Sequence, residues 1–97
     1  KSMVVIHIEH PVPDFDGWKK AFDADPIGRK SSGVKKYRLY RSVSNPGYIA
    51  IELEFEDLRN AEDTLKKLQA LWGQVEGSII TRGPKTAIFE IIEAAVV

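Results

Sequence analysis

Four stretches of the chain alternate apolar and polar residues, which is the period of a half-buried β-strand. They lie at residues 3–9, 34–43, 48–55 and 85–93. The third is the most regular, and its apolar face carries Ile49, Ile51, Leu53 and Phe55. Because Ser-Asn-Pro-Gly at 44–47 is a cluster of turn-forming residues, we expect the second and third strands to form a hairpin.

Two stretches between the strands carry apolar residues at the spacing of an amphipathic helix. Asp14 precedes the first as an N-cap, and the Asp25-Pro26 break predicts two helical segments, about 14–24 and 26–31. Asp57 precedes the second helix, and Gly73 marks its expected end. The expected buried stripe of this helix is Leu58, Ala61, Leu65, Leu68 and Trp72. A short extended piece is expected at Ile79 and Ile80.

The order strand, helix, strand, strand, helix, strand predicts one α+β domain over residues 1–97. Its economical arrangement is the ferredoxin-like βαββαβ plait, a four-stranded antiparallel sheet with both helices on one face. The strand faces that carry Ile6 and Ile8, or Ile49 and Ile51, are the candidates for contact with the helices.

The other face of the sheet mixes apolar, aromatic and charged residues. It is expected to carry Val5, His7, Glu9, Lys36, Arg38, Tyr40, Tyr48, Ala50, Glu52, Glu54, Thr86, Ile88, Glu90 and Ile92. This set is too apolar for a solvated face and too charged for a core. We therefore expect a second copy of the chain to cover it, which makes the protein a homodimer through the sheet.

Composition excludes several classes of protein. The 97 residues contain no cysteine, so a disulfide-stapled domain, a thiolate metal site and a cysteine nucleophile are ruled out. Fourteen Lys plus Arg balance fourteen Asp plus Glu, which argues against a nucleic-acid partner. No apolar run approaches the roughly 20 residues of a membrane span, and no signal-peptide core is present, so we expect a cytoplasmic protein with no membrane partner.

Residues 12–23 resemble the opening of small proteins of the dimeric α+β-barrel superfamily, that of the antibiotic biosynthesis monooxygenases. Similar proteins continue with a glycine before the second strand, a Tyr-Arg-rich strand and a Glu-Phe strand end, matched here by Gly33, residues 37–41 and residues 54–55. The resemblance implies two plaits packed sheet to sheet, each with a cleft between sheet and helices. The superfamily includes oxygenases, haem degraders, cyclases, isomerases and dechlorinating enzymes. The second helix has no histidine, which sets the chain apart from the haem degraders.

His7 and His10 are the candidate catalytic residues. Their positions have opposite parity, so in a regular strand they point to opposite faces and cannot bind one metal ion. His10 is either a general acid/base at the cleft or a structural histidine bonded to the chain before the first helix. In a plait the third strand lies beside the first, so Glu52 or Glu54 would raise the pKa of His7, unless the pair is simply an ion pair of the dimer interface.

The candidate ligand-binding residues are Arg38, Tyr40, Glu52 and Trp72. Arg38 and Tyr40 would bind an anionic or enolic aromatic molecule. Glu52 and Glu54 would do acid/base work or hold a hard cation, but salt bridges to Lys36 and Arg38 are the favoured use. Trp72 would line the cleft or belong to the core, and Trp18 is assigned to the core.

Two functions remain open. The first is a cofactor-independent monooxygenase-like or cyclase-like enzyme, without metal, acting on a small aromatic or polyketide-like substrate. The second is a non-catalytic homodimer that binds a small ligand or serves a structural role. A pocket above roughly 300 Å³ with His10 or His7 on its wall would favour the enzyme.

Overall fold

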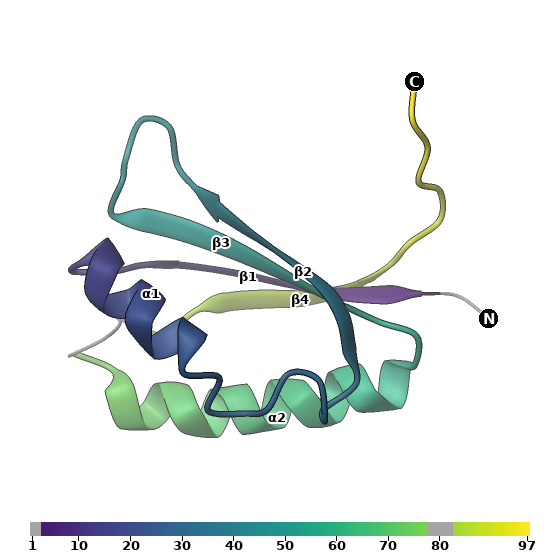
Figure 1. The fold of residues 1–97 in the computed structure, drawn as a ribbon, viewed down its shortest axis with the longest axis horizontal. Helices are drawn as coiled ribbons and strands as arrows, with labels where there is room; N and C mark the ends of the chain where they lie inside the picture. The colour runs from purple at the N-terminus through teal and green to yellow at the C-terminus, as the bar shows by residue number, and fades with distance from the viewer. Residues whose placement is uncertain (1–2, 78–82) are drawn as a thin grey trace.

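The computed structural model describes residues 3–77 and 83–97, and it forms the predicted plait (Figure 1). The elements are β1 (Val4–Pro11), α1 (Phe15–Asp23), β2 (Val34–Arg41), β3 (Tyr48–Phe55), α2 (Leu58–Val75) and β4 (Lys85–Glu90). The strands form one antiparallel sheet in the order β2-β3-β1-β4. Both helices lie on the same face of the sheet (Figure 1). The predicted hairpin and the predicted fold class are confirmed.

The core forms where the helix-facing side of the two central strands meets α1 and α2. In β1 the even-numbered residues Val4, Ile6, Ile8 and His10 are buried, while their odd-numbered neighbours are partly exposed. In β3 the buried residues are Ile49, Ile51, Leu53 and Phe55. Trp18 of α1, at 6% exposure, joins this core as predicted.

The faces of β4 are opposite to the prediction. Ile88 pairs with Ile6 and Phe89 with Val5, and residues directly opposite in an antiparallel pair share a face. Thr86, Ile88 and Glu90 therefore face the helices, and Lys85, Ala87 and Phe89 occupy the open face. The alternation of the sequence is ambiguous here because Ile88 and Phe89 are both apolar, so only the register with β1 decides between them.

β4 ends at Glu90 instead of at residue 93. The Ile91 N–H still donates to the Met3 carbonyl at 2.9 Å, but residues 92–97 have left the sheet. In Figure 1 this C-terminal stretch rises on the side opposite the helices. Ile92, predicted on the open face, is therefore not a strand residue.

The second helical segment predicted at 26–31 is a series of turns. Asp25 and Gly28 have φ values of 55° and 67°, which lie in the left-handed region and prevent a right-handed helix from continuing. The first segment is confirmed, with Asp14 accepting a hydrogen bond from the Gly17 N–H at 3.1 Å.

α2 begins as predicted, with the Asp57 side chain accepting from the Arg59 N–H at 2.7 Å. It continues past Gly73 to Val75, and Gly77, with φ of 89°, follows its end. Leu58 is 50% exposed because the helix only begins there. Thr64 takes a buried place that was not predicted, at 1% exposure.

The extended piece expected at Ile79 and Ile80 lies outside the described residues. Within the described residues, no helix combines the length and apolar character needed to cross a membrane.

Candidate functional site

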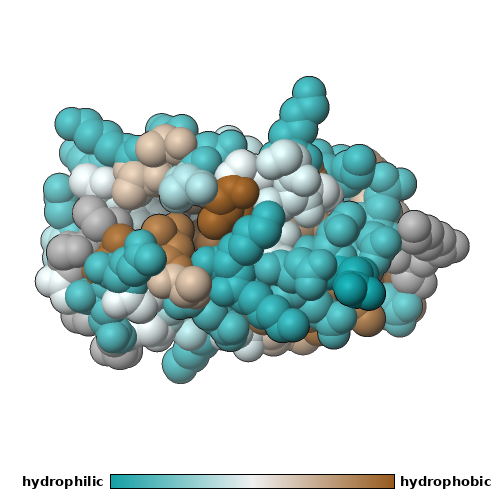
Figure 2. Space-filling model, turned by 90° about the horizontal axis from the view of Figure 1, so that it is seen from below, coloured by the Kyte–Doolittle hydropathy of each residue, from teal (hydrophilic) through white to brown (hydrophobic). Residues whose placement is uncertain are grey.

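A cavity of about 100 Å³ lies between the sheet and the two helices, and it is partly open to solvent. Its walls come from β1, β3, α1, α2 and the turns that follow α1, and most of the lining side chains are apolar. Among the residues that the structure describes, the ionisable ones on its wall are His10 and Arg29. Figure 2 shows this helix-bearing side of the molecule, where apolar side chains reach the surface among hydrophilic ones.

His10 is held with one ring nitrogen bonded and the other free. Its Nδ1 lies 3.1 Å from the Pro11 carbonyl oxygen. A carbonyl oxygen only accepts, so Nδ1 must carry the proton and donate. Burial lowers the pKa of His10 and so favours the neutral ring, whose Nε2 then carries a lone pair and no hydrogen.

The Nε2 atom of His10 is buried without a hydrogen-bond partner among the described residues, and the whole residue is 1% exposed. Leaving a buried acceptor unsatisfied costs about 1–3 kcal/mol. A buried polar group without a partner in a native structure calls for an explanation, such as a bound ligand or a catalytic role. A neutral Nε2 can accept a hydrogen bond or a proton, and His10 is one of the residues that line the cavity.

An aromatic row runs along the cavity wall from His10. The Trp18 ring lies edge-on to the imidazole with centroids 6.2 Å apart, and it stacks on Phe22 at 5.3 Å. Trp72 of α2 also lines the cavity while packing against the core. Trp72 is therefore both a cavity-lining residue and a neighbour of the core.

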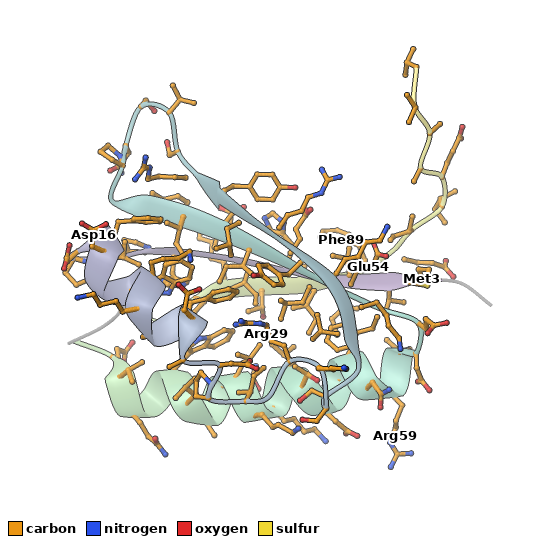
Figure 3. All side chains as sticks on the ribbon, in the orientation of Figure 1. Met3, Asp16, Arg29, Glu54, Arg59 and Phe89 are labelled. Atoms are coloured by element: carbon orange, nitrogen blue, oxygen red, sulfur yellow. The ribbon has the colours of Figure 1, made fainter. Side chains whose placement is uncertain are left out.

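Arg29 is a cavity residue that sequence reasoning missed. Its guanidinium carbon lies 4.0 Å from the centre of the Phe22 ring, and Figure 3 shows the side chain beneath the sheet on the helix side. The pattern that would have found it is Asp25 four residues before Arg29, within turns marked by Pro26 and Gly28.

His7 lies on the opposite face of the sheet, in a polar network that does not touch the cavity. Its Nδ1 is 3.2 Å from Glu52 and its Nε2 is 2.8 Å from Glu9. The Tyr40 hydroxyl donates to Glu52 and the Tyr48 hydroxyl donates to Glu9, each at 2.8 Å. We call these five residues the open-face network.

The open-face network makes His7 an ion-pair member instead of a free base. Two carboxylates can both be satisfied by the ring only when both nitrogens carry protons. The hydrogen bond that His7 donates to Glu9 is the largest cause raising the pKa of His7, and the same bond lowers the pKa of Glu9. The expected approach of Glu52 to His7 is confirmed.

The candidate residues from the sequence therefore divide between two sites. His10 and Trp72 line the cavity, whereas His7, Arg38, Tyr40 and Glu52 lie on the open face. Glu52 ion-pairs with His7, and the favoured salt bridges of the glutamates to Lys36 and Arg38 are not formed within 4 Å among the described residues. Arg38 instead interacts with the Tyr40 hydroxyl, whose pKa is raised mainly by its hydrogen bond to Glu52.

The network predicts a pH dependence of stability. A raised His7 pKa adds stability that is complete below its ordinary value of 6.5 and is lost as the pH rises through the folded-state value. A lowered Glu9 pKa adds stability that is complete above 4.5 and is lost as the pH falls through the folded-state value. The network should therefore stabilise most between about pH 4.5 and 6.5.

The measurement is urea unfolding of the wild type and of His7→Gln at a series of pH values. The contributions of His10 and the other titrating groups are the same in both proteins, so they cancel in the difference between the two free energies of unfolding. The difference should peak in that window and reach no more than about 1 kcal/mol, since side chains 28% and 38% exposed are screened by water. A difference that is flat with pH would contradict the ion-pair assignment.

Filling the cavity should stabilise the protein. Ala21 of α1 lines the cavity, so Ala21→Leu would place three further carbon atoms in empty space. We expect the free energy of unfolding to rise by about 0.5–2 kcal/mol, as for other cavity-filling changes, measured by urea unfolding. A loss of stability would show that the space is already filled.

Comparison with known proteins bears on the fold. No protein-family model and no curated protein matches the chain. Among solved structures, a dimeric ferredoxin-like protein from an uncultured marine organism matches with a TM-score of 0.68 and 14% identity, covering 98% of this chain and 100% of its own. This likeness shows that the chain has a ferredoxin-like fold.

Two further solved structures have the same fold. A protein of unknown function from Nitrosomonas europaea has a TM-score of 0.69 and 13% identity over 99% of this chain and 95% of its own. A protein provisionally described as an antibiotic biosynthesis monooxygenase from Bordetella bronchiseptica has a TM-score of 0.63 and 16% identity over the whole of both chains. The resemblance drawn from the sequence is thus confirmed for the ferredoxin-like fold, and at these identities the likeness shows the fold alone.

Proposed function

We propose that the cavity binds a small aromatic substrate and that His10 acts on it as a general base. The observation that supports this most is the buried Nε2 atom of His10, which has no partner among the described residues and belongs to a residue on the cavity wall. A neutral imidazole with its lone pair in an apolar space is well suited to take a proton at neutral pH. The class of activity is cofactor-independent oxygenation or cyclisation.

The volume of the cavity limits the size of the substrate that it can hold. At about 100 Å³ it does not reach the roughly 300 Å³ that would favour an enzyme, although His10 does lie on its wall. A substrate of several fused rings does not fit this space. An apolar protein cavity of about 150 Å³ accepts benzene. Because this cavity is partly open, a single ring with its substituents toward solvent is the ligand that the space favours.

The reaction begins with a proton moving from an acidic C–H or O–H of the substrate to Nε2, which leaves an enolate and an imidazolium. In an oxygenation, dioxygen is the oxidant: an activated CH₂ group becomes C=O, and the second oxygen atom leaves as water with the two hydrogens. In a cyclisation, the enolate carbon attacks a carbonyl of the same molecule and no oxidant is needed. Apolar walls keep water from competing.

The test is a thermal-shift titration with phenol and other single-ring enols on the wild type, His10→Ala and Trp72→Ala. His7→Gln is the matched control, because it replaces the histidine on the other face. We expect ligand stabilisation in the wild type and the control and its loss in both cavity variants. Equal stabilisation of all four proteins would overturn the proposal.

The open face supports a second proposal, a homodimer formed through the sheet. Phe89 is 55% exposed and lies on this face beside the open-face network, and Tyr40, a member of that network, is 41% exposed. Figure 3 shows Phe89 and Glu54 on the side of the sheet away from the helices. A solved neighbour of the same fold is described as dimeric. A second copy would remove this apolar surface from water while the charges remain paired.

The alternative is a non-catalytic homodimer, for which His10 is a structural residue. It would be favoured if single-ring compounds bind without any turnover under air. Product analysis of the same compounds, with and without the protein, separates the two functions.

A further inference from the structure

We propose that Arg29 binds a carboxylate of the substrate at the open end of the cavity, so that the ligand is a small aromatic monocarboxylate with a hydroxyl group at its other end. This rests on the proposed function of the cavity and specifies the chemistry that it recognises. Arg29 is the cation of the cavity wall among the described residues.

The guanidinium of Arg29 is held in place by four contacts. Its Nη1 donates to the Phe22 carbonyl at 2.8 Å, and its Nε lies 3.6 Å from Asp25. Its central carbon lies 4.0 Å from the centre of the Phe22 ring and 4.9 Å from the centre of the Tyr37 ring. A guanidinium has five N–H groups, and these contacts leave donors for a planar carboxylate.

The two polar groups of the cavity wall lie at the two ends of the aromatic row. His10 is 1% exposed, while the side chain of Arg29 is 17% exposed and stands nearer to solvent. Trp18 and Phe22 lie between them, because Trp18 contacts the imidazole edge and Phe22 contacts the guanidinium. A single aromatic ring lying along Trp18 and Phe22 would direct one substituent to each end.

Each end selects a different chemical group. The Nδ1–H of His10 is committed to the Pro11 carbonyl, so Nε2 offers only a lone pair and requires an O–H donor from the ligand. Arg29 offers only donors and a positive charge, so it requires an anion. A hydroxyl at the buried end and a carboxylate at the wet end satisfy both.

Asp25 would compete with the ligand carboxylate for the Arg29 guanidinium, so its substitution is the most specific test of this role of Arg29. Its carboxylate is near the Arg29 Nε and also accepts from the Arg29 backbone N–H at 2.9 Å. Asp25→Asn keeps an oxygen for that backbone bond and a residue type that tolerates the left-handed φ of 55°. It removes one negative charge beside the proposed carboxylate site.

The experiment is calorimetric titration with 4-hydroxyphenylacetate, its uncharged methyl ester and 4-methoxyphenylacetate. In the wild type the acid should bind about tenfold more tightly than the ester, as one charge-assisted contact predicts, and the methoxy compound should also bind more weakly. Asp25→Asn should tighten the acid and leave the ester unchanged. Arg29→Gln should abolish the preference for the acid.

The outcomes separate this inference from the function on which it rests. Equal binding of acid and ester by the wild type, or an Asp25→Asn protein that binds the acid no better, overturns the role of Arg29 and leaves the cavity proposal standing. Failure of all three compounds, and of phenol, overturns both. Arg29→Gln also loses its stacking contacts, so the Asp25→Asn result is decisive if that variant does not fold.

Discussion

Replacing His10 with phenylalanine is expected to raise the free energy of unfolding by about 1 kcal/mol while abolishing the response to aromatic ligands. The change removes a buried acceptor without a partner, worth about 1–3 kcal/mol, and gives up one hydrogen bond of about 1 kcal/mol to the Pro11 carbonyl. Phenylalanine keeps an edge-on contact with Trp18, and the adjacent cavity has room for its extra atoms. The unsatisfied Nε2 atom that the proposed function requires lowers the free energy of unfolding, and this substitution removes it.

His7→Phe is the matched control for this prediction, measured by the same urea unfolding. Both nitrogens of His7 have carboxylate partners, so its replacement should lower the free energy of unfolding. Opposite signs for the two histidines are the expected result. A His10→Phe protein that is clearly less stable than the wild type would show that His10 is a structural residue.

Replacing Phe89 with glutamate is expected to convert the proposed dimer into a monomer. In a two-fold interface each substitution occurs twice, so two large side chains are lost from contact. At about 2 kcal/mol each, this weakens association by about a thousandfold, before any repulsion from Glu9 and Glu52 is counted. Light scattering on a size-exclusion column measures the mass directly.

Val43→Glu provides the control, because Val43 is a fully exposed apolar residue in the β2–β3 loop, outside the strands of the sheet. It should leave the mass unchanged. A wild-type monomer at high concentration, or a Phe89→Glu dimer, would rule out association through this face.

The fold could be predicted where one face of an element is plainly more apolar than the other. The strands containing Ile6 and Ile51 and the caps Asp14 and Asp57 are such cases, and their structure agrees with the prediction. The two faces of β4 could not be assigned from the sequence, because Ile88 and Phe89 place an apolar residue on each. Only the register with β1 shows which residue faces the helices.

The site was predictable only in part. Parity separated His7 from His10, and strand order brought Glu52 to His7. The role of Arg29 was hidden, because it depends on turns whose left-handed residues fold the chain back under α1 instead of extending the helix. The volume of the cavity also depends on how side chains from five segments pack, which no local pattern records.

The central claim is that Nε2 of His10 is an unprotonated acceptor within the cavity. Nitrogen-15 NMR of the imidazole, recorded at neutral pH before and after addition of phenol, tests it directly. We expect a neutral His10 ring protonated on Nδ1, with an Nε2 resonance that shifts when phenol binds, while the His7 resonances stay in place. A ring protonated on Nε2, or an Nε2 resonance that phenol leaves unchanged, would contradict it.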